Sequence, residues 1–139
     1  MSKLLLPLTL GALMLVIAAC GSKGTADTGT LIKSGTVGNL TVTLSNSSGQ
    51  LKHGGDEFFL TFKDSSGKPV DVGAASLTFH MPQMGSMMPM NDPATLTTTE
   101  TAGIYHGKAN IQMAGEWQAQ ISFEGSAGKG QASLSVTAQ

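Results

Sequence analysis

The feature that most constrains the fold is a regular alternation of apolar and polar residues in several short segments after residue 38. In NLTVTLS, the side chains of Leu40, Val42 and Leu44 alternate with polar ones, as a strand with one buried face requires. We find no helical periodicity beyond the first twenty residues. The residues expected to face the core are Leu40, Val42, Leu44, Phe58, Leu60, Phe62, Ala75, Leu77, Phe79, Trp117, Ala119, Ile121, Phe123, Ala132, Leu134 and Val136.

Turn-forming residues separate these segments at short intervals. The stretches NSSGQ, HGGD, DSSGKP and EGSAGKG carry the Gly, Asn, Asp and Pro that turns need. About seven strands over roughly a hundred residues is typical of an immunoglobulin-like β-sandwich, so we predict this all-β fold for residues 38–139. A small closed barrel is the competing architecture. Because the only cysteine is Cys20, the fold must be stabilised by burial without a disulfide.

The first twenty residues have the pattern of an export signal. Lys3 is followed by an apolar run from Leu4 to Ala19, which ends in the small residues before Cys20. The sequence VIAAC resembles a bacterial lipobox, so we predict a lipoprotein signal peptide over residues 1–19 and lipidation of Cys20. An uncleaved signal anchor is the alternative. Either reading predicts a membrane-attached protein of the cell envelope that faces the periplasm or the cell exterior.

Residues 20–37 are rich in Gly, Ser and Thr and poor in apolar side chains. Such a composition is typical of flexible linkers. We therefore predict a flexible tether that connects the lipid anchor to a single domain over residues 38–139.

Methionine is concentrated in one segment, FHMPQMGSMMPMND, at residues 79–92. Thioether sulfur is a soft, neutral ligand that favours Cu(I) over harder ions. Pro82 and Pro89 within the segment and Pro93 directly after it limit the freedom of the backbone, and Gly85 allows the segment to fold back on itself. We predict a copper site for Cu(I), and Cu(II) stays open because imidazole and backbone nitrogens could bind it. The candidate ligands in this segment are His80, Met81, Met84, Met87, Met88 and Met90.

Two histidines could complete a mixed sulfur and nitrogen site. His80 lies on the polar face of its expected strand, and His106 points away from the core if Tyr105 points inward. We expect His106 to meet the methionine segment from a neighbouring strand. By contrast, Met113 is expected in the core and His53 in a solvated turn. The alternative for the methionines is an adaptable apolar patch that covers one end of the sandwich or docks a partner protein.

The sequence also resembles the YtkA-like and FixH-related family of exported bacterial domains. The resemblance rests on HMPQMGSMMPM and on GIYHGKANIQMAGEWQAQISF, and it covers roughly residues 38–125. It implies an immunoglobulin-like domain linked to copper handling or to the assembly of haem-copper oxidases. It implies Met81, Met84, Met88 and Met90 as copper donors, with His80 beside them. The chain departs from FixH-type members because a lipobox replaces their spanning anchor helix.

Two functions from different classes follow. The first is a lipid-anchored copper module that exchanges Cu(I) with a donor or acceptor protein, in trafficking, tolerance or oxidase metallation. The second is a metal-free module that docks a partner through the methionine segment. We do not expect an enzyme, because no nucleophile and base are paired and no carboxylates are clustered. The balanced charge and few basic residues argue against nucleic acid as a partner.

Overall fold

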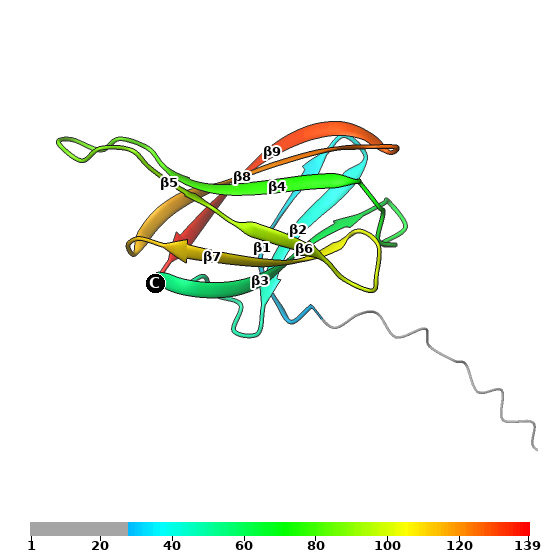
Figure 1. Cartoon of the computed structure of the whole chain (residues 1–139), viewed down its shortest axis with the longest axis horizontal. Coiled ribbons are helices and arrows are strands. Elements are labelled where there is room, and N and C mark those ends of the chain that lie inside the picture. The colour runs from blue at the N-terminus through cyan, green and yellow to red at the C-terminus, as the bar shows by residue number, and fades with distance from the viewer. Residues whose placement is uncertain (1–27) are drawn as a thin grey trace, which may run out of the picture.

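The computed structural model describes residues 28–139, which form two packed antiparallel sheets (Figure 1). One sheet has the strand order β1-β2-β3-β7-β6, and the other has the order β5-β4-β8-β9. The strands are β1 (Thr30–Val37), β2 (Leu40–Asn46), β3 (Gly54–Lys63), β4 (Ala74–Met81), β5 (Met90–Pro93), β6 (Thr95–Thr98), β7 (Ile104–Ile111), β8 (Gly115–Gly125) and β9 (Gly128–Ala138). Over these residues no helix forms that could cross a membrane.

The order of the strands is that of an immunoglobulin-like sandwich. The run β2-β3-β7-β6 corresponds to strands A, B, E and D of that fold, and β5-β4-β8-β9 corresponds to C′, C, F and G. The predicted fold class is therefore confirmed. The described residues contain nine strands rather than about seven. The two additional strands are β1, which precedes the A-like strand, and β5, which corresponds to C′.

The inward-facing residues predicted from the alternation form the core between the two sheets. Phe58 of β3 and Phe79 of β4 meet edge to face, with ring centroids 5.7 Å apart. Phe62 and Phe123 make a second such contact across the sheets at 5.3 Å. Trp117 is fully buried and donates from Nε1 to the Met113 carbonyl. Edge-to-face geometry suits the quadrupoles of the rings and adds to the stabilisation that burial gives.

The predicted tether is wrong at its carboxyl end, where Thr30–Val37 forms β1. This strand pairs with β2 from Thr30↔Asn46 to Val37↔Leu40, with a bulge between Leu31 and Lys33. The Gly, Ser and Thr content of residues 20–37 suggested a linker, yet β1 also carries Ile32 and Val37, which pack against the core. Gly35 also lies so close to β9 that a Cβ there would be 2.4 Å from Leu134 Cδ2. The lipobox, Cys20 and the first part of the tether lie outside the described residues.

Candidate functional site

The methionine segment forms the β4–β5 hairpin, which extends well beyond the sandwich (Figure 1). Its strands pair in one register from Thr78↔Pro93 to Met81↔Met90, and Met84 and Met87 form a further bridge nearer the tip. Gly85 and Ser86 make the connecting turn, which the Met87 amide closes by donating to the Met84 carbonyl at 3.0 Å. Gly85 has a φ of 58° and Ser86 a negative φ, the pattern of a type II′ turn.

Three methionines at the end of this hairpin are exposed, and we call Met84, Met87 and Met88 the methionine tip. Their exposed fractions are 62%, 43% and 76%. Leu31 is the other large apolar residue exposed to this degree within residues 28–139. Exposed thioethers are accessible to solutes without any rearrangement of the core. The tip is therefore the part of the segment whose sulfurs solutes can reach.

Pairing places two tip sulfurs on the same face of the hairpin. Residues directly opposite in an antiparallel pair project to the same side, with their Cβ atoms about 5 Å apart. Met84 and Met87 are such a pair, whereas Met88 follows Met87 in the unpaired part of the hairpin. The hairpin thus presents two neighbouring thioethers on one face, and a third exposed thioether follows them directly in the chain.

Two prolines interrupt the hydrogen bonds between the tip and the rest of the hairpin. If the common register continues, Pro82 and Pro89 lie opposite each other, between Met81↔Met90 and Met84↔Met87. Neither proline has an amide hydrogen to donate. Residues 82, 83, 88 and 89 accordingly carry no strand pairing. The tip is a short turn joined to the sandwich by two chain segments with a gap in the ladder.

Two predicted ligands belong to the core instead of the tip. Met81 is only 5% exposed, and its Cε lies 3.1 Å from the position that a Cβ on Gly115 would occupy. Met90, its partner across the hairpin, is half-buried and packs against the core. Met81 therefore fills space between the sheets, and an ion in solution cannot reach its sulfur. Met113 also packs against the core, as predicted.

His80 lies on the outer face of β4, as the alternation predicted. Its Nδ1 is 2.7 Å from Oδ1 of Asn91, its partner across the hairpin. Because an amide oxygen accepts, Nδ1 is the donor in this contact. The unpaired residues 82 and 83 lie between His80 and Met84. Four residues of extended chain span about 13 Å, so one ion reaches both side chains only if they lean together.

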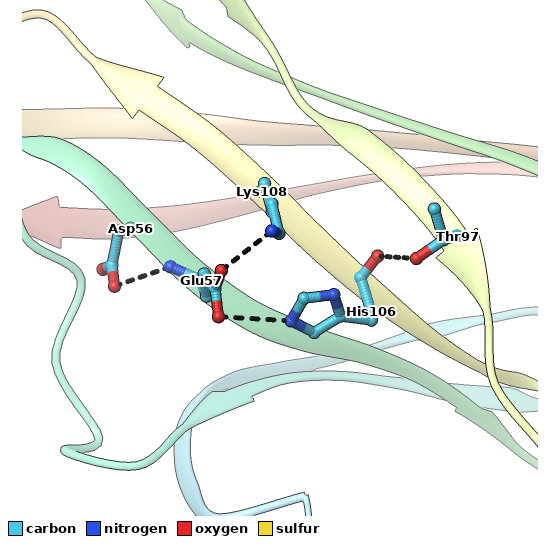
Figure 2. Close-up of polar contacts among 5 residues, drawn as sticks. All are labelled: Asp56, Glu57, Thr97, His106 and Lys108. Atoms are coloured by element: carbon cyan, nitrogen blue, oxygen red, sulfur yellow. Dashed lines mark hydrogen bonds and ion pairs between the residues drawn. The ribbon is translucent and has the colours of Figure 1, made fainter.

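The prediction that His106 meets the methionine segment is wrong. His106 is on β7, in the other sheet, where it faces outward and pairs with Phe59 of β3. Figure 2 shows its Nε2 pointing to Glu57, with 3.5 Å between Nε2 and Oε2. Lys108 contacts the other carboxylate oxygen at 3.1 Å. The two histidines therefore lie on the outer faces of opposite sheets.

Glu57, His106 and Lys108 form a solvated ion-pair network. Lys108, followed by the nearby His106, holds the pKa of the Glu57 carboxyl below its usual range. Thr97 donates to the His106 carbonyl, and the Glu57 amide donates to Asp56 (Figure 2). Exposed pairs of this kind contribute little to stability. No group of three or more His, Cys, Asp or Glu side chains within residues 28–139 is arranged to hold a metal.

The contact between Asp92 and Gln112 was not predicted from the sequence. Asp92 on β5 is buried, and it accepts from the Gln112 backbone amide at 2.9 Å and from Gln112 Nε2 at 2.6 Å. This pair ties the base of the hairpin to the turn between β7 and β8. The residues are twenty positions apart, so only the strand pairing of the fold brings them together.

His53, which was predicted in a solvated turn, is an exposed residue whose Nδ1 contacts the Gln139 carbonyl.

Comparison with known proteins identifies the family. The family model described as YtkA-like matches residues 36–122, which is more than half of the chain. Comparison with curated proteins and with solved structures gives no significant match. The matched region runs from the end of β1 into β8 and includes the whole β4–β5 hairpin. This chain therefore belongs to the YtkA-like family.

Proposed function

We propose that the methionine tip binds Cu(I) reversibly and that the protein passes the ion to, or receives it from, another protein outside the cytoplasm. The observation that supports this most strongly is the position of Met84 and Met87, two exposed thioethers opposite each other across a two-residue turn. Soft, uncharged sulfur fits Cu(I), which accepts few ligands, and it needs no deprotonation. Met88, which follows Met87 directly, supplies a third exposed sulfur.

The exposure of the tip also fits exchange better than storage. A cation held between two sulfurs on a protruding turn keeps one side open to a partner. An incoming sulfur or nitrogen can replace the protein ligands one at a time, so release does not require unfolding. A buried site would hold the ion behind the packed core instead.

A Cu(I) competition titration tests the proposal. We compare the natural sequence with a triple variant, Met84→Leu, Met87→Leu and Met88→Leu, and use Met81→Leu as the matched control. Leucine keeps the approximate volume and removes the sulfur. The triple variant should lose at least about tenfold in affinity, or about 1.4 kcal/mol, while Met81→Leu should bind as before. Equal affinities for the natural sequence and the triple variant would end the copper proposal.

The pH dependence of binding separates the two ligand sets. A protonated imidazole cannot bind a metal ion, whereas a thioether takes up no proton. If His80 Nε2 is a ligand, the affinity should fall as the pH is lowered from 7.5 to about 5.5, and His80→Gln should abolish that fall. An affinity that stays constant over this range assigns the site to sulfur alone.

Docking of a partner without metal is the second candidate. The observation in its favour is the same exposed apolar tip, because flexible methionines also suit adaptable protein contacts. The two functions give different results in one pair of experiments. A docking tip would show no Cu(I) affinity, and Met84→Leu, Met87→Leu and Met88→Leu would leave partner capture largely intact because the apolar surface is kept.

We further propose that the protein acts as a binding module rather than an enzyme and is held at a membrane of the cell envelope by lipid on Cys20. The lipobox-like VIAAC supports the anchor. Cys20→Ala should move the protein from the membrane fraction to the soluble fraction. Unchanged membrane association would contradict lipidation at this residue.

A further inference from the structure

We propose that the methionine tip is also an oxygen-acceptor site, at which hydrogen peroxide converts Met84, Met87 and Met88 to sulfoxides while the sandwich stays folded. We also infer that this modification releases Cu(I), a second step that rests on the proposed function. The tip would then respond to peroxide outside the cytoplasm and give up its metal in return.

Exposure separates the six methionines of the described residues into two groups. An oxidant must reach the sulfur lone pair, so reactivity follows accessibility. The three tip residues are all exposed, and Met88 is exposed most. Met81 is buried, and Met90 and Met113 are packed against the core. The inner group is thus shielded by the same side chains that hold the two sheets together.

The chemical step is transfer of one oxygen atom with two electrons. A thioether lone pair attacks one peroxide oxygen, the O–O bond breaks, and the other oxygen leaves as water after proton transfer. Sulfur is oxidised and peroxide is reduced. The product carries a polar S=O group, whose oxygen is a hard donor, so it no longer suits a soft Cu(I) ion.

The surroundings of the tip allow this change without unfolding. A polar sulfoxide in the core would be buried without a partner, which destabilises the folded state. At the tip the new oxygen faces solvent, and the ladder gap at Pro82 and Pro89 separates the turn from the paired strands. The turn itself is open, since a Cβ on Gly85 would meet no atom within 4 Å. Methionine sulfoxide reductases can therefore reach and reverse the modification.

The first experiment uses metal-free protein. After treatment with hydrogen peroxide, peptide mass spectrometry measures the oxygen gained at each methionine over time. We expect the order Met88, Met84, Met87, with Met81 slowest by at least about tenfold, and an unchanged unfolding midpoint in urea. The triple variant Met84→Leu, Met87→Leu and Met88→Leu should take up three fewer oxygen atoms. Oxidation of Met81 at the rate of Met88, or unfolding in step with oxygen uptake, would overturn the proposal.

The second experiment tests release. Peroxide is removed, and the Cu(I) affinity of the oxidised protein is measured before and after repair by the two reductases, one for each sulfoxide epimer. We expect a loss of at least about tenfold that repair restores. An affinity unaffected by oxidation would overturn the release step. If the untreated protein has no Cu(I) affinity, the proposed function fails, while selective oxygen uptake in the first experiment still supports the acceptor site.

Discussion

Methionines a few positions apart in this chain have different physical roles because they differ in burial. Met81 contributes a flexible side chain that fills a gap beside Gly115, which is the common use of methionine in cores. Met84 and Met88 place the same side chain in solvent. The thioether is chemically identical in both settings, so position alone decides whether it stabilises the fold or remains free to react.

Substitutions at Met81 should affect stability without affecting metal binding. We expect Met81→Ala to lower the free energy of unfolding by about 2–5 kcal/mol, because it leaves a cavity between the sheets. Met81→Leu should cost under about 1.5 kcal/mol. Urea unfolding measures both, with Met88→Ala as the exposed control, which should stay within about 0.5 kcal/mol of the natural sequence. Equal losses for Met81→Ala and Met88→Ala would contradict the assignment of Met81 to the core.

The sequence contained enough information to place Met81 correctly. Leu77 and Phe79 were predicted to face inward, and the same alternation continued by two residues assigns Met81 to the core. The clustering of methionines outweighed that periodic signal. The outward position of His80 was predicted from the same pattern and is confirmed. Its contact with Asn91 was not predicted, because it depends on the register across the hairpin.

At the scale of the element, the β4–β5 hairpin combines a firm base with a simple turn. Asp92 and Gln112 fix the base, and Gly85 supplies the positive φ that a two-residue turn needs at its first central position. The geometry of Met84 and Met87 follows from this turn. An altered turn should therefore change metal binding even though no ligand is replaced.

The turn prediction has a close internal control. Gly85→Ala forces a residue with a Cβ into positive φ at a cost of about 1–2 kcal/mol, so the turn should distort and the Cu(I) affinity should fall several-fold. Gly38 makes the equivalent turn between β1 and β2, with a φ of 60° and no atom within 4 Å of an added Cβ. Gly38→Ala should carry similar strain and leave copper affinity unchanged. Equal affinities for both variants in a Cu(I) titration would contradict a role for the Gly85 turn.

The edge strand β1 was the hardest element to predict. The alternating strands emerged clearly because burial imposes a period of two on their sequences. In β1 the side chains are largely exposed, and the strand is held by backbone pairing with β2 and by contact with β9. Composition alone could not distinguish such an edge strand from a linker, since both are rich in small polar residues.

At the scale of the whole molecule, the hydroxyl of Tyr105 makes one of the hydrogen bonds that connect the two sheets. Tyr105 on β7 donates from its hydroxyl to the Gly73 carbonyl, just before β4, at 2.6 Å. Burial raises the pKa of Tyr105, and the nearby Asp71 carboxylate adds to the effect. The protonated hydroxyl is therefore the form that the folded protein favours.

Because the pKa of Tyr105 is raised in the folded state, the protonated hydroxyl stabilises the fold at pH values below the ordinary tyrosine pKa of about 10. This stabilisation is lost as the pH rises through the higher pKa of the folded state. Tyr105→Phe should lower the free energy of unfolding by about 1 kcal/mol near pH 8, because the Gly73 carbonyl loses its donor. Above pH 10 the difference between the two proteins should shrink. Urea unfolding from pH 8 to 11 measures it, and Tyr105 is the only tyrosine in the chain. A difference that stays constant with pH would contradict the raised pKa.

The arrangement of the strands explains why the fold class could be predicted while the complete site could not. Alternation and turn spacing are local patterns, and they led to the sandwich. The neighbours of each strand depend on contacts between residues far apart in sequence, and the local pattern does not determine them. The predicted position of His106 beside the methionine segment depended on such neighbours, and it is wrong because His106 lies in the opposite sheet.

The unpaired stretch at Pro82 and Pro89 has a consequence for how this protein can change over evolutionary time. Folding cooperativity propagates through backbone ladders and packed side chains, and both are interrupted before the turn is reached. Substitutions beyond that interruption should change the chemistry of the exposed turn with little effect on the stability of the sandwich. The sequence of the turn can therefore vary during evolution while the sandwich remains stably folded.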